Sequence, residues 1–319
     1  MTRRALLTGG TGFVGRHVHD RLRGAGWEVR CLSRRPDVAR AQWPGREWMG
    51  GDVGDASSIE LALRDCQAAL YLVHGMADLR PGWEEREVRA AETFARAAGR
   101  RGLERIVYLG GVAPAGPPSR HLRSRLRTGE ALRAGPVPCL ELRAGMIVGA
   151  GGASWAIVRD LSARLPAMIL PAWLLNRSEP VALDDVSAAL VAGLALELEG
   201  SDWWDLPGPE ALSGRDILLR VAAVQGRRPW LLRVPMVSPG LSSHWIRLIT
   251  RADHALAREL VEGLRSDLLA QRPGFWARAG LDPPMVLEEA ARRALAAETR
   301  LAPHQHLVEA LAAALTRRA

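Results

Sequence analysis

Residues Ala5–Gly15 read A-L-L-T-G-G-T-G-F-V-G, and this stretch decides the fold. A short apolar strand runs into a glycine-rich turn, which opens onto a segment with the apolar spacing of a helix. Gly9, Gly12 and Gly15 follow the G-x-x-G-x-x-G spacing. Such glycines allow a tight turn, a close approach of backbone N–H groups to a pyrophosphate, and close packing of the helix on the strand. The stretch therefore predicts a dinucleotide-binding βα unit, with the positive end of its helix facing the phosphates.

Strand and helix patterns alternate through the first half of the chain. Strands are predicted at Arg4–Thr8, Val29–Leu32, Glu47–Gly50, Ala68–Val73, Arg105–Leu109 and Cys139–Arg143. Helices are predicted at Phe13–Ala25, Ser57–Leu63, Glu84–Arg101 and Ser119–Ala134. Alternation of this kind is typical of a parallel sheet with helices on both faces. We therefore expect an α/β fold, a Rossmann-type doubly wound parallel sheet with a ligand at the carboxyl ends of its strands.

The character of the sequence changes after Gly145, where tryptophan and proline become frequent. Helices are predicted there at Asp184–Leu198, Gly214–Val224, Leu241–Leu264, Pro284–Glu298 and Leu307–Arg318. We expect residues 1–150 to form an NAD(P)-binding Rossmann domain. Residues 151–319 are expected to form a smaller, mainly helical substrate or lid lobe, with part of 179–200 returning to the Rossmann core.

The composition argues against several classes of protein. With 48% hydrophobic and 24% charged residues, the chain reads as a globular protein. The apolar run before the glycines is too short for a signal peptide, and no run is long enough to span a membrane. We therefore expect a cytoplasmic protein. Cys31, Cys66 and Cys139 lack metal or disulfide spacing and are expected to be buried thiols.

The net charge of +8 raises the question of nucleic-acid binding. All 43 basic residues are arginine, spread along the chain without a dense run or interleaved aromatic residues. The absence of lysine is typical of a genomic composition bias. Attraction of an anionic cofactor explains the charge more simply, so we expect a small-molecule substrate and no nucleic acid.

The second predicted strand bears on the choice between NAD and NADP. An acidic residue that binds the ribose of NAD stands at the carboxyl end of this strand. Glu28 instead precedes Val29–Leu32, and the carboxyl end reads Ser33-Arg34-Arg35. The planar guanidinium of arginine suits a 2′-phosphate, so NADP(H) is favoured over NAD(H). Arg35 is also read as solvated surface.

Six motifs arrive in the order of one superfamily. They are T-G-G-T-G-F-V-G at Thr8–Gly15, G-D-V at Gly51–Val53, Y-L-V-H-G-M at Tyr71–Met76, I-V-Y-L-G-G at Ile106–Gly111, L-R-A-G-M-I-V-G-A-G at Leu142–Gly151 and V-A-L-D-D-V at Val181–Val186. Over roughly residues 3–225 the chain resembles the atypical and extended short-chain dehydrogenase/reductase superfamily, whose epimerase-like members bind NAD(P)H. The resemblance and the motifs together give a predicted cofactor-binding set: Thr8, Gly9, Gly10, Thr11, Gly12, Phe13, Val14, Gly15, Ser33, Arg34, Arg35, Asp52, Val53, Val73, His74, Gly75, Leu109 and Gly110. Asp52 is read either as an adenine contact or as a simple turn residue.

The catalytic pair that the superfamily usually carries is missing. That pair is a tyrosine followed four residues later by a lysine, which lowers the pKa of the phenol for proton exchange. This chain has no lysine, and its two tyrosines, Tyr71 and Tyr108, fall in or at the end of predicted strands. The family register places the pair at Leu122 and Leu126, within about one residue, and Gly110–Gly111 replaces a supporting serine. Epimerase or dehydratase chemistry on nucleotide sugars is therefore not expected.

Two histidines are the candidate catalytic residues, as proton donors of a reductase. His74 follows the fourth predicted strand and is expected near the nicotinamide or its ribose, and His121 begins the helix that carries the tyrosine in the family. The alternative for each is a structural histidine that bonds loop backbone. Ser119 is predicted to cap the same helix. His17 and His19 point to different faces of a helix, so no metal site is expected.

Two functions from different classes remain. The first is an NADPH-dependent oxidoreductase that acts on a mostly apolar small molecule. Trp155, Met168, Trp173 and Trp245 suggest a lipophilic pocket, although such residues are as readily ordinary core. The second is a non-catalytic NADP(H)-binding protein, either a redox sensor or an assembly or regulatory protein. Both explain a cofactor-binding half that lacks the tyrosine–lysine pair.

Overall fold

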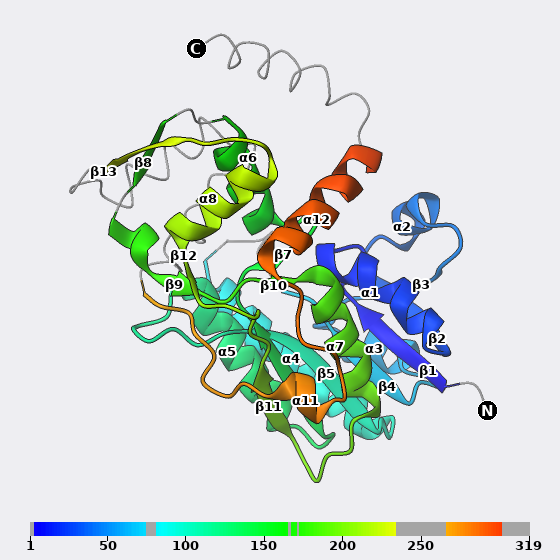
Figure 1. Cartoon of the computed structure of the whole chain (residues 1–319). Helices are drawn as coiled ribbons and strands as arrows, with labels where there is room; N and C mark the ends of the chain where they lie inside the picture. Colours follow the sequence, from blue (N-terminus) through cyan, green and yellow to red (C-terminus); the bar gives the residue numbers. More distant parts are fainter. Residues whose placement is uncertain (1–2, 75–80, 165–166, 171, 234–265, 302–319) are drawn as a thin grey trace.

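The computed structural model of the chain describes residues 3–74, 81–164, 167–170, 172–233 and 266–301 (Figure 1). Its centre is a seven-stranded sheet in the order β3-β2-β1-β4-β5-β6-β11, with every adjacent pair of strands parallel. The strands are β1 (Arg3–Thr8), β2 (Trp27–Ser33), β3 (Glu47–Gly50), β4 (Ala68–Tyr71), β5 (Arg105–Gly111), β6 (Cys139–Ala144) and β11 (Asp202–Asp205). The order of the first six is that of a doubly wound dinucleotide-binding sheet, which confirms the predicted fold class.

Helices cover both faces of this sheet. They are α1 (Phe13–Gly24), α3 (Ala56–Ala62), α4 (Trp83–Arg100), α5 (Arg120–Arg133) and α7 (Leu183–Ala195). Leu7 faces α1 and α7 in one apolar layer, whereas Leu6 faces α3, α4 and α5 in the other. Successive side chains of a strand point to opposite faces, so a strand buried on both sides reads as a continuous apolar run.

A third apolar core lies in the second half of the chain. It joins α6 (Ala153–Arg164), α8 (Gly214–Val224) and α12 (Leu287–Leu301), and Trp155 is fully buried within it. Figure 1 shows α6 and α8 together at one end of the molecule, with α12 passing beside α8. Trp155 is therefore core rather than pocket lining, while Trp245 lies outside the described residues.

Short elements connect these parts. The described residues contain three two-strand pairs: β7 (Ile147–Val148) with β10 (Val181–Ala182), β8 (Ala167–Leu170) with β13 (Trp230–Arg233), and β9 (Arg177–Ser178) with β12 (Leu212–Ser213). The short helices are α2 (Pro36–Gln42), η1 (Ala172–Leu175) and α11 (Phe275–Arg278). The sequence patterns did not predict α2, which buries only Ala39 and so has no apolar stripe. The helices predicted at 241–264 and 307–318 lie outside the described residues.

Part of the second half packs on the nucleotide-binding sheet. Helix α7 lies against α1 and β5, and strand β11 pairs with β6. Helix α7 falls within residues 179–200. The division of the chain into two domains, with part of 179–200 in the Rossmann core, stays a prediction.

Burial accounts for the three cysteines. Cys31, Cys66 and Cys139 are all buried and free, as expected. Burial raises the pKa of the Cys31 thiol to about 12 and that of Cys66 to about 11. Across the described ranges, no helix is both long and apolar enough to cross a membrane. The same ranges contain no group of three potential metal ligands.

Candidate functional site

The glycines of the first βα turn are each required by a close backbone contact. Gly9 has a φ of +70°, and a Cβ atom there would lie 2.7 Å from the carbonyl oxygen of Leu72. A Cβ atom on Gly15 would lie 2.2 Å from the carbonyl oxygen of Gly9. The amide of Gly12 donates to that same oxygen at 2.9 Å, which closes the turn. The loop therefore takes a shape that larger residues exclude.

The start of α1 presents unpaired backbone amides. Gly12 is the N-cap of the helix, and no side chain caps it. The first amide that bonds back to Gly12 is that of Arg16, at 3.0 Å. The amides of Phe13, Val14 and Gly15 therefore have no acceptor inside the helix. Amides at the positive end of a helix suit a phosphate group, so the residues present fit the pyrophosphate of a dinucleotide.

A second glycine-rich segment, Gly149–Gly152, lies against the start of α1. This contact was not predicted from the sequence. The side chain of Arg16 folds back so that its Nε donates to the Gly12 carbonyl oxygen at 3.3 Å. A Cβ atom on Gly151 would lie 3.0 Å from Arg16 NH2, and one on Gly152 would lie 2.8 Å from the Phe13 ring. The G-A-G-G run that follows β7 is the feature of the sequence that could have indicated this contact.

Thr8, the residue before the glycine turn, holds two strands of the sheet together. Thr8 is fully buried, and its hydroxyl donates to the Leu70 carbonyl oxygen at 3.2 Å and accepts from the Leu72 amide at 3.0 Å. It thereby joins the carboxyl ends of β1 and β4, next to the glycine turn. Val73 is partly buried beside this point. Contacts of Thr8 and Val73 with a cofactor stay predictions, and Gly75 lies outside the described residues.

The carboxyl end of β2 has an exposed basic pair. Arg34 and Arg35 are exposed, and in the described part of the chain neither guanidinium has a hydrogen-bond or ion-pair partner. Ser33 Oγ accepts from the backbone amide of Arg35 at 3.1 Å. Glu28 lies at the other end of the strand, where it pairs with Arg4 at 2.6 Å. Glu28 is thus remote from the carboxyl edge, as the sequence predicted.

The predicted cofactor-binding residues in the turn after β3 and in the rest of the glycine loop differ in how deeply they are buried. The Asp52 carboxylate accepts from the Gly54 amide at 2.8 Å, as in a simple turn, and its contact with adenine stays a prediction. Val53 is partly buried against the core beneath α3 and α4. Gly10 is buried, whereas Thr11 is exposed at the tip of the loop.

A buried carboxylate explains the glycine at the end of β5. A Cβ atom on Gly110 would lie 2.6 Å from Glu141 Oε1. Glu141 is fully buried and accepts from Arg143 Nε and Arg133 Nε, each at 2.9 Å. The sequence predicted that Gly110–Gly111 replaces the supporting serine of the family, and this stays a prediction. In the structure, Glu141 fills the space beside Gly110.

The two predicted catalytic histidines come together at the carboxyl edge of the sheet. Their ring centroids are 6.2 Å apart and the rings are nearly perpendicular, at 81°. His74 is exposed, and His121, in the first turn of α5, is partly buried. Burial and the nearby charge of Arg125 lower the pKa of His121 to about 3. The His121 ring is therefore neutral at neutral pH.

The tyrosines take no part in this group. Tyr71 and Tyr108 are buried with ring centroids 6.0 Å apart, and burial raises the pKa of both phenols. The hydroxyl of Tyr108 donates to the backbone carbonyl oxygen of Arg125 at 3.0 Å. Ser119 caps α5 by accepting from the Leu122 amide at 3.3 Å, which confirms its predicted role.

The lowered pKa of His121 predicts a pH-dependent stability. Its pKa of about 3 lies below the 6.5 of an ordinary histidine, so the unfolded chain binds more protons between these values. Stability is then complete above the unfolded pKa and is lost as the pH falls toward the folded pKa. We expect Tm to fall with decreasing pH in this window, and less steeply in His121→Asn. Equal slopes for the two proteins, followed by thermal melts, would contradict this.

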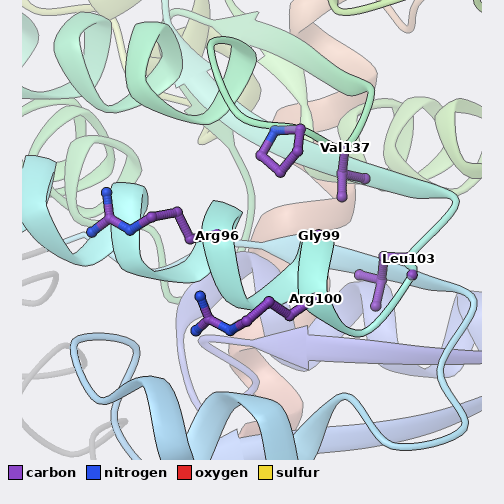
Figure 2. Close-up of a pocket in the computed structure, with 7 residues that line it drawn as sticks. Arg96, Gly99, Arg100, Leu103 and Val137 are labelled. Atoms are coloured by element: carbon purple, nitrogen blue, oxygen red, sulfur yellow. The ribbon is translucent and has the colours of Figure 1, made fainter.

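Two open depressions lie on the opposite edge of the molecule. One, of about 550 Å³, is lined by residues that include Arg96, Arg100 and Val137. Figure 2 shows Arg96 and Arg100 reaching outward from α4, with Leu103 and Val137 on the other side. The other, of about 740 Å³, includes Arg105, the first residue of β5. Both adjoin the amino ends of strands, so neither contacts the glycine loop or the histidine pair.

The comparison with protein families agrees with this arrangement. Residues 5–138 match the model of the NAD dependent epimerase/dehydratase family. The match covers less than half of the chain. The predicted resemblance to epimerase-like proteins is confirmed by this match, and the matched segment contains the glycine loop, both histidines and the end of β5.

Two curated relatives are named as reductases. The chain is 29% identical over 246 residues to the ceramide reductase of Caulobacter vibrioides, with 74% of each protein aligned. It is 28% identical over 231 residues to the (4-alkanoyl-5-oxo-2,5-dihydrofuran-3-yl)methyl phosphate reductase of Streptomyces griseus, with 70% of this chain and 74% of the relative aligned.

Solved structures share the fold at lower identity. The UDP-glucose 4-epimerase of Thermotoga maritima matches with a TM-score of 0.69 at 14% identity, covering 93% of this chain and 98% of the epimerase. A short-chain dehydrogenase/reductase superfamily protein of Agrobacterium tumefaciens with bound NAD matches with a TM-score of 0.66 at 18% identity, covering 95% and 100%. These likenesses establish the fold.

Proposed function

We propose that the protein is an NADPH-dependent oxidoreductase that acts on a small, mostly apolar molecule. One observation carries the proposal, namely that His74, His121 and Arg125 meet at the same edge of the sheet as the open start of α1. A reductase needs a hydride donor held beside an oriented acceptor. The names of the two curated relatives, reductases of a ceramide and of an alkanoyl dihydrofuran phosphate, support this direction and an apolar substrate.

Each part of the site has a role in this proposal. When bound, NADPH supplies a hydride from its nicotinamide ring. The amides at the start of α1 bind the pyrophosphate, and Arg34 at the end of β2 binds the 2′-phosphate. His74 and His121 face the acceptor and offer N–H groups to its oxygen. Because the superfamily's tyrosine and lysine are absent, these groups take over the polarisation of the acceptor.

Hydride transfer is the decisive test of this function. The purified protein is incubated with each C4-deuterated NADPH isomer and a small-molecule cell extract, and mass spectrometry follows the label. We expect deuterium in a metabolite with the native protein and none with Gly12→Trp. Tight NADPH binding without any label would favour the non-catalytic sensor instead. Absence of NADPH binding would overturn the assignment of the glycine loop.

Substitution of Arg34 tests the cofactor preference. Arg34→Ser is expected to raise the Kd for NADPH by about 10- to 100-fold, because a charge-assisted hydrogen bond contributes about 1.5–3 kcal/mol. The Kd for NADH should stay the same, since NADH has no 2′-phosphate. Arg35→Ser is the matched control and should have a small effect on either Kd. A parallel rise for both cofactors in Arg34→Ser, measured by tryptophan fluorescence titration, would refute the assignment.

A further inference from the structure

Arg125 is held in a fixed position at the end of β5. Its NH2 group donates to the carbonyl oxygen of Leu109 at 2.7 Å and to that of Gly110 at 2.9 Å. Its own carbonyl oxygen accepts from the Tyr108 hydroxyl at 3.0 Å. Within the described part of the chain the guanidinium has no carboxylate partner. These contacts fix a permanent cation near the histidine pair.

One N–H group of the Arg125 guanidinium has no hydrogen-bond acceptor among the described residues. Arg125 Nε is buried and has no hydrogen-bond partner among the described residues. It lies 3.3 Å from the position that a Cβ atom on Gly111 would take. A buried donor without an acceptor costs about 1–3 kcal/mol. Nε–H is therefore a buried donor that no acceptor in the described part of the chain satisfies.

His121 stands next to this donor. The two residues are one helical turn apart on α5, so their side chains share a face. No protein hydrogen bond is found for the His121 ring in the described ranges, and burial together with the charge of Arg125 lowers its pKa to about 3. The site thus holds two free N–H donors and a cation. It holds no group that releases a proton readily at neutral pH, since arginine stays protonated and neutral imidazole is a very weak acid.

We propose that Arg125 and His121 form an oxyanion-binding site, and that the substrate is an α,β-unsaturated carbonyl compound reduced at its carbon–carbon double bond. The inference rests on the proposed function. Hydride from the reduced nicotinamide dinucleotide adds to the β-carbon, and the electron pair of the double bond moves to give an enolate. The enolate oxygen accepts from Arg125 Nε–H and from the His121 ring. A proton from water then reaches the α-carbon, which gives the saturated carbonyl compound and the oxidised dinucleotide.

The chemistry of the two possible acceptors favours this assignment. Reduction of a plain ketone places negative charge on a single alkoxide oxygen, which demands a proton from a nearby acid. An enolate spreads its charge over oxygen and carbon, and prearranged N–H donors alone stabilise it well. A neutral imidazole also polarises the carbonyl group in triosephosphate isomerase, where an enediolate forms. The groups around Arg125 supply the N–H donors that stabilise an enolate. They do not include the acid that an alkoxide requires.

A spectroscopic probe tests the oxyanion site without turnover. 4-Nitrophenol, whose phenolate absorbs visible light, is titrated into the protein saturated with NADP⁺. We expect the pKa of the bound phenol to fall below that of the free phenol, because the site stabilises its anion. Arg125→Met should abolish this fall and Arg125→Lys should weaken it. Arg127→Met, an exposed substitution on the same helix, should leave it intact.

A matched set of compounds tests the substrate class. A long-chain enone, the saturated ketone and the isolated alkene of equal length are each offered with deuterated NADPH. We expect the enone alone to react, with deuterium at its β-carbon. Loss of one oxyanion donor typically costs about 100-fold or more in kcat, so Arg125→Met should reduce turnover of the enone by about that factor.

The outcomes separate the two proposals. An unshifted phenol in the intact NADP⁺ complex, or reduction of the saturated ketone to an alcohol, overturns the enone assignment and leaves the oxidoreductase standing. Failure of NADP⁺ and NADPH to bind overturns the proposed function, and this inference falls with it. His121→Leu supplies a second variant, since it removes one donor without touching the contacts that hold Arg125.

Discussion

Gly15→Ala is expected to abolish NADPH binding and to lower the stability of the fold. The added Cβ atom would lie 2.2 Å from the carbonyl oxygen of Gly9 and 2.9 Å from the Cα atom of Gly10. Both are backbone atoms, so no side-chain rotation relieves the clash. Either α1 moves away from the loop or the loop moves away from the helix. In both cases the amides at the start of α1 no longer face a common point, and the phosphate site is lost.

Gly24→Ala is the matched control for this prediction. Gly24 ends the same helix, and no atom lies within 4 Å of the position of its added Cβ. This substitution should leave the Kd for NADPH unchanged and stabilise the protein by up to about 1 kcal/mol. Fluorescence titration and thermal unfolding measure both quantities. A Gly15→Ala protein with the native Kd would show that the helix does not need this close approach.

Glu141→Ala is expected to destabilise the protein by about 3–5 kcal/mol, the usual cost of removing one partner of a buried ion pair. Glu141 is fully buried, and the Arg143 side chain that it pairs with is 8% exposed. Without the carboxylate, the Arg143 guanidinium would keep only the face of the Trp203 ring, whose centroid is 4.1 Å away. A buried cation without a counter-charge is costly, because water no longer solvates it.

An exposed ion pair provides the comparison for Glu141. Arg3 and Glu104 pair at 3.4 Å with side chains 49% and 61% exposed. Glu104→Ala should therefore change the free energy of unfolding by less than about 1 kcal/mol. Urea denaturation of both variants measures the difference. Equal midpoints for the two would mean that Glu141 is not required for its arginine partners to remain buried.

The sequence predicted the elements whose pattern is local. Glu47–Gly50 and Gly214–Val224 have the same bounds in the structure as in the prediction, because apolar spacing and flanking turn residues mark both. Strand β11, D-W-W-D, was not predicted. Its pairing partner is β6, about sixty residues earlier in the chain. Such a strand is defined by the edge that it joins rather than by its own residues.

The site was predicted only where single motifs define it. The glycine loop follows from its spacing, and each histidine follows from its place after a strand or at the start of a helix. That the two histidines meet, with Arg125 beside them, depends on α5 packing beside the end of β5. The contact between Gly110 and Glu141 likewise joins neighbouring strands that lie far apart in the sequence. Such long-range contacts have no local signature in a single sequence.

The buried carboxylate beside Gly110 also constrains how this protein can evolve. A serine at Gly110 would bring its Cβ atom to 2.6 Å from Glu141 Oε1, so it requires that Glu141 change first. A change at Glu141 leaves the buried Arg143 guanidinium without its carboxylate partner, so it requires that Arg143 change too. A hydroxyl side chain at Gly110 therefore requires coordinated changes at both Glu141 and Arg143.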